Sequence, residues 1–323
     1  MRADAPDLDG GIGIAEPRER GDLWRFSHEA MHTVFEVYAS HPDERYAAQA
    51  AQAAFALVDR LEGDLSRFRS NSDITRVNQL TAGESARVGE AALECLLIAR
   101  HLYDVTDGAF DVAIGTGLPS LEIDADDFLI RATAGGVCVD LGGIGKGYAV
   151  DLMAELLEEW GVERAFVHGG FSSAVALETP AACDGWPLTL SDPREPSRVF
   201  SRLSMRQTAL SASGVRKGDH ILDPRTRTPV RGRLAAWVAL PRPGTAASGH
   251  EGFRLAPAAV ADGLTTAFML LGVDRIAALC ARSPGLEAWI LPDGVSACAA
   301  DLLHFNGRAT PGDDDGGRGR QAK

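Results

Sequence analysis

A glycine-rich segment with one lysine is the part of this sequence best suited to bind an anion. Residues 140–151 read DLGGIGKGYAVD, and Lys146 stands between Gly145 and Gly147. Glycines let backbone N–H groups approach a ligand closely because no Cβ intervenes. A helix that starts here would add unpaired N–H donors and a partial positive charge. The segment therefore predicts a site for a phosphate or carboxylate group.

The glycine spacing does not fit the two common nucleotide-binding motifs. A P-loop needs a glycine where Asp140 stands and a serine or threonine where Gly147 follows the lysine. A dinucleotide fingerprint needs a third glycine where Tyr148 stands. A tight turn that requires small residues only for packing would give the same pattern. The glycines alone therefore leave anion binding and packing as alternatives.

An aspartate and a threonine four residues apart predict a second kind of chemistry. Asp262 and Thr266 fall in a segment with a helical pattern, so their side chains would lie on one face. A carboxylate with a hydroxyl suits Mg²⁺ or Ca²⁺ and suits zinc poorly. Two side chains are too few for a cage made by the protein alone. Local hydrogen bonding to the helix is the alternative.

Two further segments carry residues that could move protons or accept hydrogen bonds. His220 begins the sequence HILDPRT, and histidine titrates near neutral pH and can act as a general base. Asp111 ends the sequence TDGAFD and could accept hydrogen bonds from a ligand. Ser213, His220 and Asp223 could also form a hydrolase triad. No G-x-S-x-G motif surrounds Ser213, which argues against that alternative.

Composition limits the classes of protein to which the chain could belong. It has 323 residues, 45% of them hydrophobic, and a net charge of −13. The acidic balance argues against non-specific binding of nucleic acid. The five cysteines are scattered, with no C-x-x-C pair, which indicates neither a disulfide framework nor a cysteine–zinc site.

The two ends of the chain have compositions typical of disordered segments. Residues 1–22 are rich in Asp, Gly, Arg and Glu, without the apolar stretch of a signal peptide, and predict a disordered leader. Residues 306–323 predict a disordered tail. No stretch approaches the roughly 18 apolar residues of a membrane span. We therefore expect a cytoplasmic protein without a membrane span.

Hydrophobic periodicity predicts helices and strands in irregular alternation, which favours an α+β fold over a doubly wound α/β fold. Helical patterns cover residues 47–61, 91–103, 149–160 and 257–271. Strand patterns cover residues 33–38, 136–139, 164–168, 234–240 and 287–291, with further strands between 186 and 210. Residues 66–78 and 244–252 read as turns and loop.

Taken in order, these segments resemble the ApbE family, the FAD:protein FMN transferases. The family signature D-L-G-G-I-x-K-G-Y-x-x-D is similar to residues 140–151. Its T-D-G-A-F-D, H-I-[IL]-D-P-x-T and D-x-x-x-T blocks are similar to residues 106–111, 220–226 and 262–266. The resemblance implies a T-fold-related α+β domain over residues 23–305, with mixed or antiparallel sheets and flanking helices.

The resemblance also implies binding sites for FAD and Mg²⁺. Phe68 would pack on the isoalloxazine ring, and Lys146 would neutralise the diphosphate. The residues implied to line the FAD site are Met31, Phe68, Ala109, Phe110, Asp111, Gly142, Lys146, Tyr148, His220 and Ile221. Asp262 and Thr266 would bind Mg²⁺ with the backbone carbonyl of Gly145, and Thr265 lies adjacent. Phosphate oxygens of FAD would complete the coordination.

The implied reaction is the transfer of FMN from FAD to a serine or threonine hydroxyl of an acceptor protein, with release of AMP. His220 is the candidate base for the hydroxyl proton, and Asp111 is the second candidate. Two residues depart from the family pattern at positions that bear on the acceptor. Phe171 stands where aspartate is common, and Arg227 stands where glycine is usual. An FAD pyrophosphatase and a flavin-binding protein without turnover remain the alternatives.

Overall fold

The structure is a computed structural model that describes residues 12–14, 22–114, 116–181, 183–215, 218, 221–242, 256–294 and 302–305. The helices of this part of the chain are α1 (Glu44–Leu65), α2 (Asp73–Asn78), α3 (Glu90–Val105), α4 (Gly145–Glu159), α5 (Pro257–Phe268) and α6 (Val273–Arg282), with a short 3₁₀ helix at Leu118–Ser120. The strands are β1 (Ile12–Ile14), β2 (Leu23–Ala30), β3 (Thr33–Ser40), β4 (Ser85–Arg87), β5 (Leu121–Asp124), β6 (Leu129–Ala132), β7 (Ala165–Gly169), β8 (Ser173–Ala176), β9 (Trp186–Ser191), β10 (Val199–Met205), β11 (Thr208–Gly214), β12 (Arg233–Pro241), β13 (Glu287–Pro292) and β14 (Leu303–Phe305).

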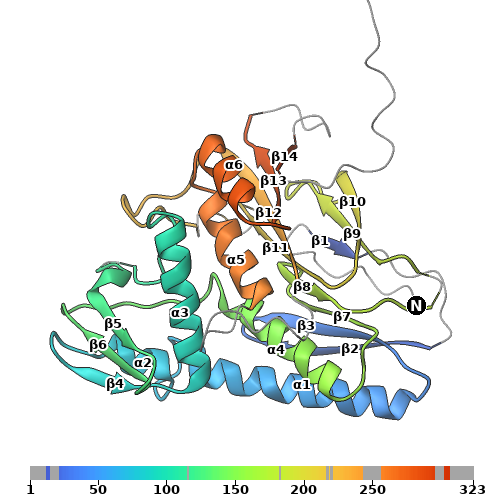
Figure 1. Cartoon of the computed structure of the whole chain (residues 1–323), viewed down its shortest axis with the longest axis horizontal. Helices are drawn as coiled ribbons and strands as arrows, with labels where there is room; N and C mark the ends of the chain where they lie inside the picture. The colour runs from blue at the N-terminus through green and yellow to red at the C-terminus, as the bar shows by residue number, and fades with distance from the viewer. Residues whose placement is uncertain are drawn as a thin grey trace, which may run out of the picture.

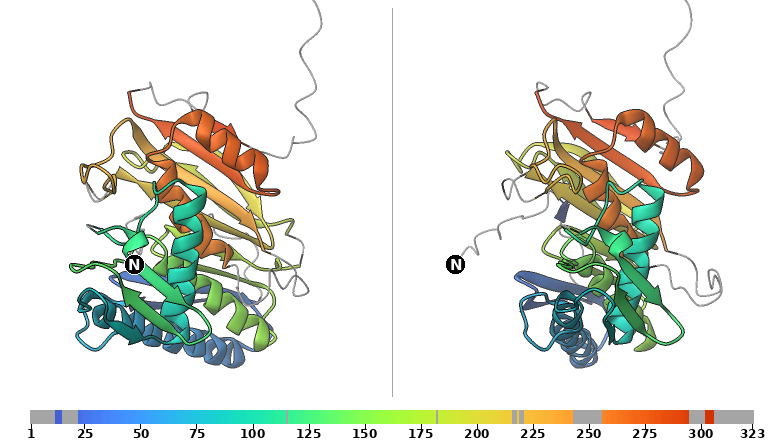
Figure 2. Two further views of the ribbon diagram at one scale, coloured as in Figure 1. Left: turned by 60° about the vertical axis from the view of Figure 1, so that its left-hand side comes forward. Right: turned by 90° about the vertical axis from the view of Figure 1, so that its left-hand side faces the viewer.

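An eight-stranded sheet in the order β14-β13-β12-β11-β8-β7-β3-β2 forms the centre of the fold (Figure 1). Each neighbouring pair in this sheet is antiparallel. Figure 2 shows α1 at one end of the molecule and β13, β14 and α6 at the other. The sheet therefore runs the length of the fold. The helices α1, α4 and α5, which come from distant parts of the sequence, pack in series on it.

The two faces of the sheet bury two separate clusters of apolar side chains. In β3, Phe35, Val37 and Ala39 belong to the cluster that contains α1, α4 and α5. Tyr38 belongs to the other cluster, which it shares with Trp186 and the remaining apolar residues of β9. This alternation follows from the two-residue period of a strand. The helices thus cover one face, and the small sheet β1-β9-β10 covers the other.

A second small sheet, β4-β6-β5, lies beside α2 and α3, on the opposite side of the molecule from β9 and β10 (Figure 1). The loop between α1 and α2 is held by serine side chains. Ser72 caps α2 by accepting from the Thr75 N–H at 3.0 Å, and its own hydroxyl donates to the Ser66 carbonyl at 2.5 Å. Because these caps fix the loop backbone, they also fix where residues 66–68 point.

The α+β fold class is confirmed, and most predicted elements are present. The predicted strand at residues 136–139 is wrong, because Val139 forms only a single bridge with Ala113. The side chain of Asn78 instead takes both backbone groups of Val139, at 2.6 and 2.9 Å. The turn predicted over residues 66–78 contains the helix α2.

Other differences concern elements that the sequence patterns did not indicate. The strand β1 lies inside the predicted leader and pairs with β9 from Ile12 to Ile14, because a composition argument cannot detect a three-residue strand. Sequence patterns also did not predict β2, β8, α6 or the small sheet β4-β6-β5. The loop at 244–252 and the tail at 306–323 lie outside the described residues.

No helix in the described ranges combines the length and apolar character that crossing a bilayer requires.

Candidate active site

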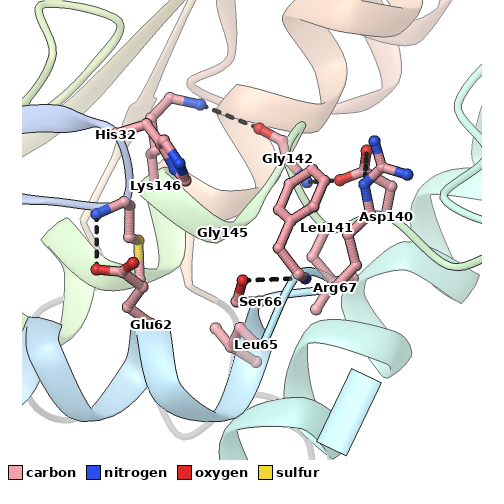
Figure 3. Close-up of a pocket in the computed structure, with 12 residues that line it drawn as sticks. His32, Glu62, Leu65, Ser66, Arg67, Asp140, Leu141, Gly142, Gly145 and Lys146 are labelled. Carbon is pink, nitrogen blue, oxygen red and sulfur yellow. Dashed lines mark hydrogen bonds and ion pairs between the residues drawn. The ribbon is translucent and has the colours of Figure 1, made fainter. Parts of the chain in front are cut away.

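Two adjoining cavities bring most of the predicted site residues together. The first has a volume of about 150 Å³ and lies between the β2–β3 hairpin, the end of α1 and the start of α4 (Figure 3). The second has a volume of about 470 Å³ and extends to β11 and α5. Arg67, Asp140, Gly142 and Lys146 line both cavities. The cavities therefore meet at the glycine-rich turn.

The glycine-rich turn is held by its own side chains. Asp140 Oδ1 accepts from the Gly142 N–H at 2.9 Å, and Lys146 Nζ donates to the Gly142 carbonyl at 3.0 Å. The Gly145 N–H donates to the Leu141 carbonyl at 2.7 Å, and α4 begins at this residue. The predicted turn from glycines into a helix is confirmed, and Gly142, Gly145 and Lys146 all face a cavity.

The helices α4 and α5 touch at Gly147, which places Asp262 beside the turn. A Cβ at Gly147 would overlap the carbonyl oxygen of Ala258, so only glycine fits. Asp262 is 3% exposed. Its Oδ2 accepts from the Gly147 N–H at 3.2 Å and lies 3.7 Å from Lys146 Nζ. Burial raises the pKa of the Asp262 carboxyl, while Lys146 and the Gly147 N–H act to lower it.

A buried carboxylate at the other end of the same contact fixes the position of α5. Both oxygens of Asp151 accept from the Ala258 N–H, at 3.1 and 2.9 Å, and Oδ2 also accepts from the Ala259 N–H at 3.0 Å. These N–H groups belong to the first turn of α5, where they would otherwise be unpaired. Asp151 on α4 therefore sets the register that brings Asp262 into the cavity.

The hydroxyl groups near Asp262 have different surroundings. Thr266 lines the second cavity together with Asp262 and Ser213. Thr265 is fully buried, donates to the Asp262 carbonyl at 2.7 Å and lies 2.9 Å from Ser213 Oγ. Thr265 is therefore placed as a support for the helix and for Ser213. Thr266 Oγ1 makes the same two contacts at 3.4 Å each, and Thr266 also lines the cavity.

The oxygen atoms of Asp262, Thr266 and Gly145 would suit a cation that also binds oxygen atoms of a ligand. The described residues contain no group of three or more His, Cys, Asp or Glu that could hold a metal ion. Asp262 and Thr266 line the second cavity, and Gly145 lines the first one. An oxygen-only set with one carboxylate suits Mg²⁺, which usually keeps water or substrate phosphate among its ligands. The residues present are compatible with the predicted Mg²⁺ site.

An exposed aromatic ring stands at the mouth of the first cavity. Phe68 is 73% exposed, and the Arg67 guanidinium lies 4.5 Å from the centre of its ring. The ring of His32 lies edge-on at 6.3 Å. Met31 and His32 form the β2–β3 turn with φ of 49° and 58°, and the Met31 N–H donates to Glu62 Oε2 at 3.0 Å. The cavity thus presents an exposed aromatic surface to a ligand.

The TDGAFD segment forms part of the second cavity, through Ala109, Phe110 and Asp111. Asp111 Oδ1 accepts from the N–H groups of Ala113 at 2.7 Å and Leu118 at 3.1 Å. Burial raises the pKa of the Asp111 carboxyl, and these N–H groups act to lower it. Asp111 thus caps and organises the loop that follows it.

Tyr148, like Thr265, is a predicted site residue that does not line either cavity. It is 2% exposed and donates to Glu94 Oε2 at 2.6 Å. His220 lies outside the described residues. Its neighbours Ile221, Leu222 and Asp223 line the second cavity.

The sequence patterns gave no role to Arg67 and Glu62, and the contacts of Ser213 differ from those of the triad considered for it. Arg67 pairs with Asp140 Oδ2 at 3.0 Å, and both face the two cavities. Ser213 lies 3.4 Å from Thr266 Oγ1, and Glu62 holds the hairpin turn at Met31. Each of these residues lies inside or next to a segment that the sequence singled out, but only the fold shows which side chains face inward.

Comparisons with known proteins identify the family of this chain. The ApbE family model matches residues 31–121 and 116–250. An FAD:protein FMN transferase of Vibrio cholerae is 24% identical over 306 aligned residues, which cover 81% of this chain and 85% of that protein. An FAD:protein FMN transferase of Treponema pallidum is 26% identical, with 83% of each chain covered.

Solved structures show the same fold. The flavin transferase ApbE from Vibrio cholerae superposes with a TM-score of 0.72 at 20% identity, covering 88% of this chain and 96% of that one. The ApbE protein from Thermotoga maritima gives a TM-score of 0.73 at 21% identity, covering 88% and 97%. Because the family model spans well over half of the sequence, the chain belongs to the ApbE family.

Proposed function

We propose that this protein is an Mg²⁺-dependent FAD:protein FMN transferase. The observation that carries the proposal is the continuity of the two cavities through Arg67, Asp140, Gly142 and Lys146. One cavity offers an aromatic ring, and the other offers cationic side chains, N–H groups and a buried carboxylate. A ligand with an aromatic ring system joined to a diphosphate, as in FAD, matches both parts. The names of the curated relatives agree with this substrate.

In this proposal each cavity binds one part of FAD. Phe68 packs against the isoalloxazine ring, and Met31 and His32 form the wall beside it. The turn at Gly142 and the ammonium of Lys146 bind the diphosphate. Ala109 and Phe110 supply apolar surface in the second cavity. Tyr148 acts from a distance by fixing α4 against α3 through Glu94.

Asp262 and Thr266 would hold Mg²⁺ with the carbonyl of Gly145. The ion would supply positive charge to the diphosphate when it is bound. Phosphoryl transfer needs positioning and charge neutralisation more than covalent help from the enzyme. Asp151 and Gly147 contribute by fixing α5, and therefore Asp262, against the glycine-rich turn.

The reaction exchanges the phosphoanhydride bond of FAD for a phosphoester bond to the acceptor. The acceptor hydroxyl oxygen bonds to the FMN-side phosphorus, the bond from that phosphorus to the bridging oxygen breaks, and AMP leaves with the electron pair. The hydroxyl proton goes to His220 in this proposal, because its neighbours border the second cavity. Asp111 is the weaker candidate, since loop N–H groups already occupy its carboxylate. The cytoplasmic location also remains a prediction.

The test is incubation of the protein with FAD and Mg²⁺, with and without a domain that carries a flavinylation site. Mass spectrometry then measures AMP and acceptor labelled with FMN. Labelling that EDTA abolishes supports the transferase. Release of FMN and AMP without labelling would favour an FAD pyrophosphatase, and intact bound FAD would favour a binding protein.

The matched variants are Asp262→Ala and Asp184→Ala. Asp262→Ala should abolish labelling while leaving the fold largely intact, because it removes the only carboxylate of the proposed Mg²⁺ site. Asp184 is exposed and lies outside both cavities, so its variant should keep full activity. Full activity of Asp262→Ala would contradict the metal site.

A further inference from the structure

Arg67 occupies the junction between the two cavities. It follows α1 directly in the loop toward α2, and its side chain lines both cavities. Figure 3 shows it paired with Asp140 next to Gly142, where Lys146 also arrives. The loop backbone is fixed here, because the Arg67 carbonyl accepts from Thr75 Oγ1 at 3.2 Å. The guanidinium is therefore held in place at the point where the two proposed parts of FAD would join.

The guanidinium keeps most of its hydrogen-bonding capacity. Its Nε forms an ion pair with Asp140 Oδ2 at 3.0 Å, and its Cζ lies over the Phe68 ring, 4.5 Å from the ring centre. Within the part of the chain that the structure describes, no residue accepts a bond from either Nη group of Arg67. A guanidinium presents its donors in a planar fork that matches two phosphate oxygens at once. The free side of Arg67 is therefore suited to an anionic ligand.

The other cations of the second cavity are less available. Lys146 donates to the Gly142 carbonyl and lies near Asp262, so part of its charge is already used within the protein. Arg227 lines the second cavity but not the first, so it does not reach the junction that Arg67 occupies. Arg67 has a side chain that is 37% exposed and a single carboxylate partner among the described residues. It is the cation best placed to add charge where a diphosphate would lie.

We propose that Arg67 is a specificity-determining residue that binds the diphosphate of the flavin nucleotide and, through its cation–π contact with Phe68, orients the ring that receives the flavin. This inference rests on the proposed function for the identity of the ligand. Arg67 would thereby make the site prefer a flavin dinucleotide over a flavin without phosphate. Its role is in binding, and no proton or bond transfer is assigned to it.

The test compares Arg67→Gln with Arg69→Gln. Arg69 lies two residues away, is 52% exposed on its side chain, pairs with Glu62 and lines neither cavity. The probes are ADP, which has a diphosphate without flavin, and riboflavin, which has flavin without phosphate. Calorimetry with Mg²⁺ present gives both affinities without turnover, and competition with FAD shows that ADP occupies the same site. Thermal unfolding checks that each variant is folded.

We expect Arg67→Gln to weaken ADP binding by about tenfold or more, because it removes a charge-assisted hydrogen bond. Riboflavin binding should weaken by less than about threefold, because riboflavin would lose only the ordering of Phe68 by its cation–π contact with Arg67. Arg69→Gln should leave both affinities unchanged. In the wild-type protein, ADP affinity should fall with added salt more steeply than in Arg67→Gln.

Two results would overturn the inference. One is unchanged ADP affinity in Arg67→Gln, and the other is an equal loss of affinity for ADP and riboflavin, which would mean that Arg67 acts only on the shape of the cavity. Both results are independent of catalysis. A protein that binds ADP through Arg67 but labels no acceptor would contradict the proposed transferase and leave the role of Arg67 standing.

Discussion

Two groups of buried carboxylates lie on opposite faces of the central sheet, and their charges are balanced in different ways. On the face that carries Tyr38, Glu36 Oε1 lies 2.5 Å from Arg25, and Oε2 lies 2.8 Å from His168. On the helix-covered face, the direct partners of Asp151 within the described residues are backbone N–H groups. Asp262 has an N–H group and a lysine at 3.7 Å.

The pKa values of these carboxyls move in opposite directions. Burial by itself would raise the pKa of Glu36, but His168 and Arg25 outweigh burial and lower the pKa to about 2. Burial raises the pKa of Asp151 to about 7, although two N–H groups act against it. Backbone dipoles thus balance a buried charge less completely than cations do. Asp262 belongs to the under-balanced group, which is where an added metal cation would be most stabilising.

The largest expected effect on stability is at Glu36, whose buried charge is balanced by Arg25 and His168. Glu36→Ala leaves Arg25 and the fully buried His168 without their carboxylate, so the free energy of unfolding should fall by about 3–5 kcal/mol. Denaturant titration measures this change. Glu122→Ala is the control, because Glu122 and Arg131 are both exposed and should contribute less than about 1 kcal/mol. A loss as small as that of the control would show that Glu36 is not balanced as described.

The second prediction concerns pH and Asp151. Its pKa is higher in the folded state than the usual 3.8, so its stabilising contribution is full below pH 3.8 and is lost as the pH rises through about 7. The shift of the Asp151 pKa from 3.8 to about 7 corresponds to about 4 kcal/mol of stability, at about 1.4 kcal/mol per pKa unit. Glu36 has the opposite sign, since its contribution is present above pH 4.5 and is lost as the pH falls toward about 2.

Asp151→Asn isolates this effect, because an amide oxygen can still accept from α5 but does not titrate. Relative to the wild type, the variant should gain stability as the pH rises, by about 2–3 kcal/mol between roughly pH 5 and pH 8. Urea unfolding at several pH values measures the difference. The exposed Asp184→Asn should show the wild-type profile. If the stabilities of Asp151→Asn and of the wild type change with pH in the same way, the pKa of Asp151 is not raised in the folded protein.

The third prediction uses two glycines of α4 that lie two residues apart. Gly147→Ala would force α4 and α5 apart at Ala258, so we expect a loss of about 1–3 kcal/mol and weaker binding of FAD. A Cβ added at Gly145 would meet no atom within 4 Å, so Gly145→Ala should be neutral or add up to about 1 kcal/mol. Equal stabilities of the two variants would contradict the close contact between the helices.

The smallest expected effect on stability is at Asp262. Asp262→Asn keeps an acceptor for the Gly147 N–H and removes a buried charge that is incompletely balanced, so the free energy of unfolding should change by less than about 1 kcal/mol. Transfer activity should nevertheless be lost. Denaturant titration and the labelling assay test the two parts separately. A loss of stability comparable with that of Glu36→Ala would place Asp262 in the same class as Glu36.

The sequence predicted the long one-sided elements and the segments that border the site. The stripe Ala54, Leu57, Val58 and Leu61 in α1 has a helical period, and the alternation in residues 33–38 has the period of a strand. These patterns are visible because one face of each element is apolar. The glycine-rich turn was equally readable, since its composition permits few other structures.

The remaining features depend on contacts that no local pattern contains. Val139 has the apolar composition of a strand, but the side chain of Asn78 takes its backbone hydrogen bonds. Asp151 has the same composition cues as Asp262, yet one binds the start of α5 and the other faces a cavity. The inward direction of Arg67 follows from the caps of α1 and α2. Such distinctions arise from tertiary packing and could not be read from spacing.

The position of α5 in the sequence has a consequence for when the site can assemble. The ring wall comes from residues near Met31 and Phe68, whereas Asp262 arrives on a helix that follows β12. Folding on the ribosome proceeds from the N-terminus, so most strands of the sheet are synthesised before the carboxylate of the site. A nascent chain therefore contains the proposed aromatic part of the site before α5 has been synthesised, and the two proposed parts can meet only after α5 has emerged from the ribosome.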